Sequence, residues 1–128
     1  MIDWVFNDTK KVLVFQVSAS FLMLNKEGAL DKIHDAIEKI TSVSEKLICI
    51  FSPHESVAQV STLAPELWEN YCSLVEQLRE TDGILIDDEG RIIEHIDKCS
   101  AYYGSPTNLA HLFQLNKKPV MIMDVNIR

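Results

Sequence analysis

The apolar residues of this chain form five short runs, and the stretches between them show helical spacing. Each run is nearly continuous and rich in β-branched or aromatic residues, which is typical of strands that are covered on both faces of a parallel sheet. The predicted strands are Val12–Val17, Leu47–Phe51, Gly83–Ile86, Ser100–Tyr103 and Pro119–Met123.

Four helices are predicted between these strands. The apolar stripe of the first helix, over about 26–43, is formed by Leu30, Ile33, Ile37 and Ile40. The stripe of the second is formed by Leu67, Trp68, Tyr71, Val75 and Leu78. The third helix has Ile92, Ile93 and Ile96, and the fourth has Leu109, Leu112 and Phe113. Pro65 suits the first turn of the second helix. Ser105 and Pro106 are expected to be the N-cap and the first residue of the fourth helix.

Alternation of strands and helices predicts a doubly wound α/β fold with right-handed crossovers. We expect a three-layer sandwich, with a Rossmann-like sheet of five parallel strands in the order 3-2-1-4-5 and helices on both faces. The chain of 128 residues has the length of one domain. The prediction is a single domain over 1–128, in which 1–10 is a lead-in segment.

Charge and cysteine content exclude some functions. Twelve basic residues against 19 acidic ones give a net charge of −7, which argues against binding to nucleic acid or to anionic lipid. The three cysteines (Cys49, Cys72 and Cys99) are far apart and form no C-x-x-C pair, so no zinc site or disulfide framework is indicated. The first residues lack the pattern of a signal peptide, and no apolar stretch is long enough to span a bilayer. We expect a cytoplasmic protein without a cofactor or a metal.

Candidate binding residues follow the predicted strands. Ligands of open parallel sheets bind outside the carboxyl ends of the strands, near the point where the strand order reverses. The residues expected at this edge are Ser18 and Ser20 after the first strand, His54 after the second, and Gly104, Ser105, Thr107 and Asn108 after the fourth. A glycine followed by a helix start favours a phosphate, because free N–H groups and the positive end of the helix dipole meet there.

Each of these residues also has an interpretation without a ligand. Ser-Pro pairs start many helices that bind nothing, and a single histidine in a loop is commonly a solvated or capping residue. Asp87, Asp88 and Glu89 lack the spacing of a calcium loop, so a solvated acidic turn is the simpler interpretation. No G-x-S-x-G or Walker-type sequence is present, and no general base is identifiable for Ser18 or Ser20, so no catalytic residue is predicted.

Several segments, in order, resemble one family. They are Val14–Ser20, Phe51–His54, Leu63–Leu67 with Tyr71, Asp97–Leu109 and Lys118–Ile122. From about Lys11 to Ile127 the chain resembles the C-terminal, nucleotide-binding half of GT-B glycosyltransferases, in particular bacterial proteins similar to CDP-glycerol glycerophosphotransferases, which act in teichoic acid or surface polysaccharide synthesis. The resemblance implies a CDP- or UDP-linked donor and an N-terminal partner domain.

The resemblance also assigns roles to the edge residues. It implies that His54 and the turn from Ser105 to Asn108 face the pyrophosphate of the donor, and that Ser18 and Ser20 line the cleft between the two domains. The chain departs from the family pattern at Ser52, where an arginine is expected, and at Ser105, where an acidic residue is expected. Thr107 and Asn108 replace two serines, and Glu55 adds a negative charge.

Two functions of different classes follow from these observations. A GT-B enzyme works in the cleft between two domains, so we expect this chain to bind a donor nucleotide without being catalytic alone. The alternative is a non-catalytic interaction or regulatory module on the same fold, which the departures at Ser52 and Ser105 favour. A weaker resemblance to nucleoside deoxyribosyltransferase-like domains implies a nucleophilic glutamate on the last helix, and residues 106–116 contain no acidic residue.

Overall fold

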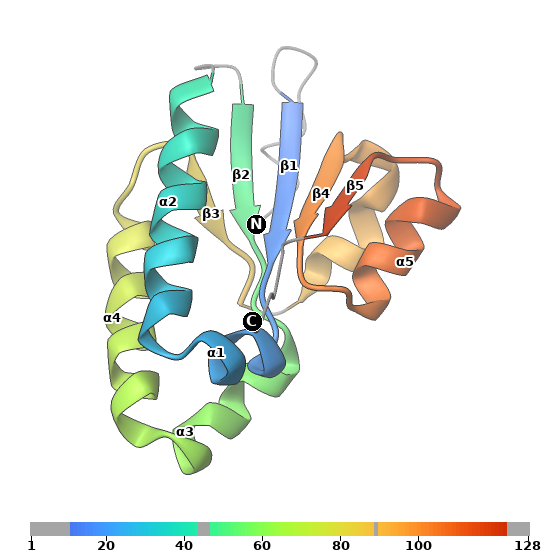
Figure 1. Cartoon of the computed structure of the whole chain (residues 1–128). Helices are drawn as coiled ribbons and strands as arrows, with labels where there is room; N and C mark the ends of the chain where they lie inside the picture. Colours follow the sequence, from blue (N-terminus) through green and yellow to red (C-terminus); the bar gives the residue numbers. More distant parts are fainter. Residues whose placement is uncertain (1–10, 44–46, 89, 123–128) are drawn as a thin grey trace.

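The computed structural model describes residues 11–43, 47–88 and 90–122. Its strands are β1 (Lys11–Gln16), β2 (Leu47–Phe51), β3 (Ile84–Ile86), β4 (Ala101–Gly104) and β5 (Val120–Ile122). They form a parallel sheet in the order β3-β2-β1-β4-β5 (Figure 1), which confirms the predicted fold class and strand order. The predicted lead-in segment 1–10 and Met123 of the fifth predicted strand lie outside the described residues.

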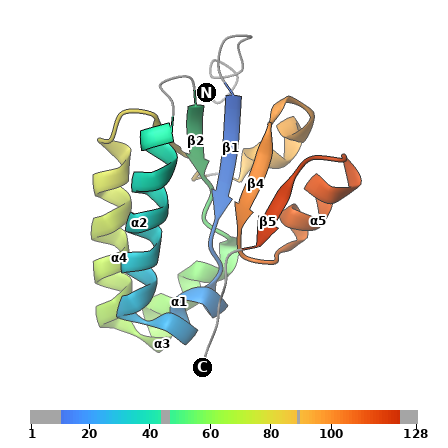
Figure 2. The same ribbon diagram turned by 45° about the horizontal axis from the view of Figure 1, so that its top comes forward.

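Helices cover both faces of the sheet (Figure 2). Their bounds are α1 (Ala19–Asn25), α2 (Glu27–Val43), η2 (Glu55–Gln59), α3 (Val60–Leu63), α4 (Pro65–Arg79), η3 (Arg91–Lys98) and α5 (Asn108–Leu115), where η marks a 3-10 helix. The helices α2 and α4 lie on one face, and η3 and α5 lie on the other. The order of the elements is therefore that of a Rossmann-like three-layer sandwich.

Two apolar cores follow from the alternation of side chains along β1. Phe15 faces α2 and α4, where it packs edge-on against Phe51 with ring centroids 5.5 Å apart. Val12 and Val14 face the other way and pack with Ile92 of η3 and with residues of α5. Because consecutive residues of a strand point to opposite faces, one apolar run supplies both cores.

Three local features differ from the sequence-based prediction. The short helices α1, η2 and α3 were not predicted, and α1 follows β1 directly. The third predicted helix is the 3-10 helix η3, in which His95 has non-helical dihedral angles. The fourth helix, α5, starts at Asn108 with Thr107 as its N-cap residue, so the prediction that Ser105 caps it and Pro106 begins it is wrong.

Gly104, at the end of β4, lies directly against the backbone of β1. It pairs with Gln16 of β1 and has φ of 148°, a conformation that residues with a side chain rarely adopt. A Cβ atom at this position would lie 2.1 Å from the carbonyl oxygen of Gln16. The absence of a side chain at residue 104 is therefore a condition for pairing the ends of β1 and β4.

Substitution of this glycine is the first test of the fold. We expect Gly104→Ala to lower the free energy of unfolding by about 2–4 kcal/mol, because the new methyl group meets backbone atoms and the φ angle is strained. Gly28→Ala is the matched control, since a Cβ atom there has no neighbour within 4 Å. It should raise stability by about 0.5 kcal/mol, as alanine does within helices. Urea unfolding measures both, and an unchanged midpoint for Gly104→Ala would contradict the close contact.

Candidate functional site

Three loops meet at the carboxyl edge of the sheet, as the sequence predicts. The N–H of Ser18, after β1, donates to the hydroxyl of Ser105 at 3.1 Å. On the other side, the N–H of His54 donates to the carbonyl of Val17 at 3.0 Å, and the N–H of Ala19 donates to the Ser56 hydroxyl at 3.0 Å. The loop after β1 is thus held between the loops that follow β2 and β4.

Ser105 is a structural residue of this edge. Its side chain is fully buried, its N–H donates to the Gln16 carbonyl at 2.9 Å, and its hydroxyl accepts the N–H of Ser18. These bonds hold the end of β4 beside the end of β1. Ser105 therefore does not present its hydroxyl to a ligand in this conformation, whereas Ser20 and Asn108 are exposed.

A hydrogen-bond network lies behind this turn. Tyr102 donates its hydroxyl to the Ser105 carbonyl at 2.5 Å, and the Thr107 hydroxyl donates to the side-chain oxygen of Gln16. Burial raises the pKa of Tyr102 to about 12, so its hydroxyl stays protonated at neutral pH. Gln16 was not predicted as part of this site. Its signal in the sequence is a single amide within an otherwise apolar strand.

The start of α5 has no side-chain cap. The Thr107 side chain is in the N-cap position but makes no hydrogen bond to the N–H groups of the first turn, since it is directed to Gln16. Asn108 begins the helix at the surface, next to the point where the strand order reverses between β1 and β4. The first turn of α5 therefore presents backbone N–H groups at the edge where α/β sheets bind ligands.

His54 caps the short helix η2, which is the role that the simpler interpretation gives it. Its Nδ1 accepts the N–H of Ser56 at 3.1 Å and lies 2.8 Å from the Ser56 hydroxyl. The histidine lines a recess of about 360 Å³, together with residues of η2, of α4 and of the turn after β3. The Ser105–Asn108 turn is not part of the lining of this recess, so His54 does not face it across one cavity.

The recess contains a buried hydroxyl without a partner. Tyr71 of α4 is 3% exposed, and its hydroxyl makes no hydrogen bond within the described part of the chain. Its ring stacks on that of Trp68, with centroids 5.5 Å apart. Desolvation, with the nearby Cys72 and Asp88, raises the pKa of Tyr71 well above its usual value.

Two carboxylates of the acidic turn after β3 have structural partners. Asp87 is buried and accepts the N–H groups of Arg91 and Ile92 at 2.9 Å each, so it holds the start of η3. Asp88 forms a two-pronged ion pair with Arg79, with N–O distances of 2.8 and 2.6 Å. Glu89 lies outside the described residues.

Ser52, which stands where the resemblance implies an arginine, is buried within the fold. Ser52 is 1% exposed, and its hydroxyl donates to Asp87 at 3.3 Å. An arginine at this position would have to be buried beside Asp87 rather than at the surface. Glu55, in contrast, is exposed beside His54 and adds negative charge to this end of the edge.

Other groups with possible chemistry lie away from the carboxyl edge. His34, Asp35 and Glu38 on the exposed surface of α2 have ligand atoms within 4.8 Å of one another. The thiols of Cys49 and Cys99 are buried, and burial raises the pKa of each to about 12, so both are protonated and unreactive at neutral pH.

Comparisons with known proteins name no family. No family model matches the chain, and neither curated proteins nor solved structures gave a significant match. Among the helices described, none has both the length and the apolar character that crossing a bilayer requires.

The two tyrosines of this region provide a matched pair of tests. We expect Tyr102→Phe to lower the free energy of unfolding by about 1–2 kcal/mol, because it removes a buried hydrogen bond to Ser105. Tyr71→Phe should leave stability unchanged or slightly higher, because the hydroxyl it removes has no partner. Urea unfolding of both variants gives the comparison. A clear loss of stability in Tyr71→Phe would mean that its hydroxyl is bonded in solution.

The Arg79–Asp88 pair predicts a dependence of stability on pH. Hydrogen bonds from Arg79 hold the pKa of Asp88 below its usual value, so the pair stabilises the fold above the unfolded-state pKa. This contribution is lost as the pH falls through the folded-state pKa. Asp88→Asn should therefore reduce stability at pH 7, and the difference from the parent should vanish at a pH well below about 4.

Asp82→Asn, in the exposed turn before β3, is the control for this measurement. Both substitutions remove one exposed carboxylate from a turn next to β3, Asp82 before the strand and Asp88 after it. Thermal unfolding across the pH range should show a pH-dependent difference for Asp88→Asn and little change for Asp82→Asn. Equal behaviour of the two variants would mean that the ion pair does not stabilise the fold.

Proposed function

We propose that this chain is a donor-nucleotide-binding domain of a GT-B-like transferase, and that it binds a nucleotide diphosphate without catalysing transfer alone. A CDP- or UDP-linked donor and an N-terminal partner domain of the same fold belong to this proposal. The observation that supports it most is the uncapped start of α5, at the edge of the sheet where the strand order reverses. A diphosphate at this place would accept the N–H groups that the Thr107 side chain leaves unbonded.

The surroundings of this helix start indicate weak binding. The helix dipole and the free N–H groups stabilise an anion by about 1–2 kcal/mol, and the Asn108 amide can add a donor. The arginine that the related proteins use is replaced by the buried Ser52, and Glu55 is negative. We therefore expect a dissociation constant on the order of millimolar, near −4 kcal/mol.

A second candidate, a non-catalytic interaction or regulatory module, is favoured by a different observation. The hydroxyl of Ser105 and the N–H of Ser18 are bonded to each other, and Ser52 is bonded to Asp87. Polar groups that a donor would use are therefore already satisfied within the protein. Under this alternative the edge has a structural role, and a partner binds elsewhere on the surface.

Charge substitution at the start of α5 distinguishes these two functions. In an amide chemical-shift titration with CDP and UDP, we expect shifts at Gly104–Leu109 in the parent protein. Asn108→Asp places a negative charge where the phosphate would bind and should abolish these shifts. Asn108→Lys should tighten binding, by about fivefold, through a charge-assisted contact.

Gln114→Glu, in the last turn of the same helix, is the matched control. It makes the same chemical change far from the proposed phosphate, and both sites are exposed. Asn108→Asp also suits the positive end of the helix dipole, so a loss of binding could not be attributed to a loss of the helix. If several millimolar nucleotide causes no shifts in either the parent or Asn108→Lys, the nucleotide proposal is wrong. The interaction or regulatory module is then the remaining function.

A further inference from the structure

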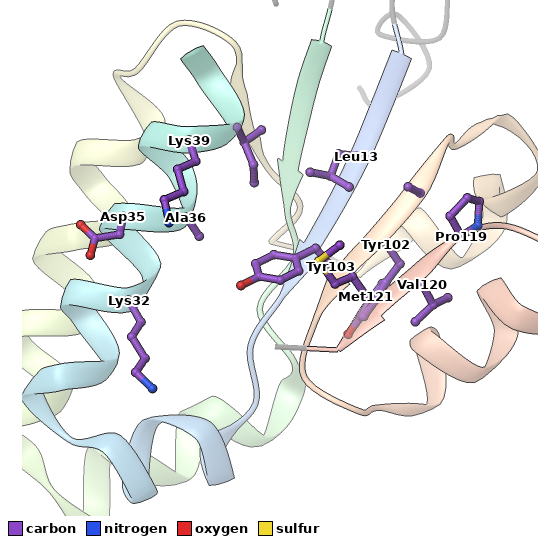
Figure 3. Close-up of a pocket in the computed structure, with 12 residues that line it drawn as sticks. Leu13, Lys32, Asp35, Ala36, Lys39, Tyr102, Tyr103, Pro119, Val120 and Met121 are labelled. Carbon is purple, nitrogen blue, oxygen red and sulfur yellow. The ribbon is translucent and has the colours of Figure 1, made fainter. Parts of the chain in front are cut away.

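A cavity of about 690 Å³ lies between α2 and the β4–β5 half of the sheet, on the face opposite to α5. Figure 3 shows its two sides, with residues of α2 on one and residues of the strands on the other. Its volume lies within the range of small-molecule binding sites. The side chains used below are Leu13, Ala101, Tyr103 and Met121 from the sheet and Lys32 and Lys39 from α2.

The apolar floor follows from the strand register. Leu13 pairs with Ala101, and Tyr103 pairs with Met121, so these four side chains point to the same face of neighbouring strands. The helix α2 packs over β2, at the other half of this face, and Met121 is left 66% exposed. Tyr103 packs against Phe15, its partner on β1, with ring centroids 5.4 Å apart. The floor is therefore apolar, partly open and formed by paired strands.

The wall of the cavity carries positive charge. Lys32 and Lys39 are two turns apart on one side of α2, and neither ammonium group forms an ion pair with any described residue. Asp35 also lines the cavity between them, but its carboxylate lies within 4.8 Å of the ligand atoms of His34 and Glu38. Figure 3 shows this carboxylate turned away from Tyr103.

We propose that this cavity binds a small amphipathic anion, with its apolar body on Leu13, Tyr103 and Met121 and its acidic group at Lys32 and Lys39. The chemical class is a free carboxylate, sulfonate or phosphate ester with an aromatic or short aliphatic body. The apolar floor accounts for the body, and two unpaired ammonium groups beside it account for the charge. The proposal is independent of the nucleotide site, because no residue of the Ser105–Asn108 turn lines this cavity.

Two fluorescent probes of similar shape test the proposal. Anilinonaphthalene sulfonate carries a negative charge, whereas phenylnaphthylamine is neutral. We expect the full chain to bind both, and decanoate to displace them. In the double variant Lys32→Gln/Lys39→Gln the sulfonate should bind about tenfold more weakly, because two charge-assisted contacts are lost, while the neutral probe is unaffected.

The control for charge is Lys26→Gln/Lys117→Gln, which changes the net charge equally at two exposed positions outside the cavity. It should bind the sulfonate as the parent does. The control for space compares Met121→Trp, which places a bulky ring on the apolar floor where the body of the ligand would lie, with Leu115→Trp on α5; both residues are exposed. Met121→Trp should abolish binding of both probes, and Leu115→Trp should not. Urea unfolding establishes that each variant is folded.

Four results would overturn the proposal. The first is sulfonate binding that is equal in the parent and in the Lys32/Lys39 variant. The second is probe binding that survives Met121→Trp. The third is a dimer, seen by sedimentation, that Met121→Trp abolishes, because a second copy would then cover this face. The fourth is co-sedimentation of the chain with anionic phosphatidylglycerol vesicles that depends on Lys32 and Lys39, because a membrane surface would then be the ligand.

Discussion

The contact between the ends of β1 and β4 is the constraint on which the carboxyl edge depends. Gly104 lies against the backbone of Gln16 because it has no side chain, and the N–H of Ser105 then reaches the Gln16 carbonyl. The helices that follow β1 and β4 lie on opposite faces of the sheet. The distance between the ends of these two strands therefore determines whether the edge is open or closed. In this chain the bonds of Ser105 to Ser18 and Gln16 close it.

Closure of the edge limits the chemistry that the domain can perform. Buried polar groups that are already hydrogen-bonded stabilise the fold, and a ligand could bind to them only if these hydrogen bonds were broken. Near this point the exposed Ser20 and the first turn of α5 remain available, since Thr107 bonds to Gln16 instead of capping the helix. A helix start without a nearby cation can hold an anion weakly but supplies no acid, base or nucleophile. The local chemistry at the start of α5 is therefore that of weak anion binding, which the proposed function requires.

The sequence predicts the architecture better than the site. Apolar runs such as Leu47–Phe51 and helical stripes such as Ile33 and Ile37 are local patterns, and the strand order follows from general rules of handedness. The start of α5 was misplaced because tertiary bonds of Ser105 and Thr107 to Gln16 override the local preference of a Ser-Pro pair. The helix α1 was missed because its seven residues, mostly apolar, show no separate stripe and continue directly from the strand.

Native-state hydrogen exchange of the Ser105 amide tests the central claim most directly. If the contact between β1 and β4 holds the edge closed, this N–H is exposed only when the whole domain unfolds. Its exchange should then give the same free energy as global unfolding by urea, as should that of the Ser18 amide. Fast exchange of both amides, at a free energy far below that of core residues such as Phe15, would contradict the account, because the edge would open while the fold persists.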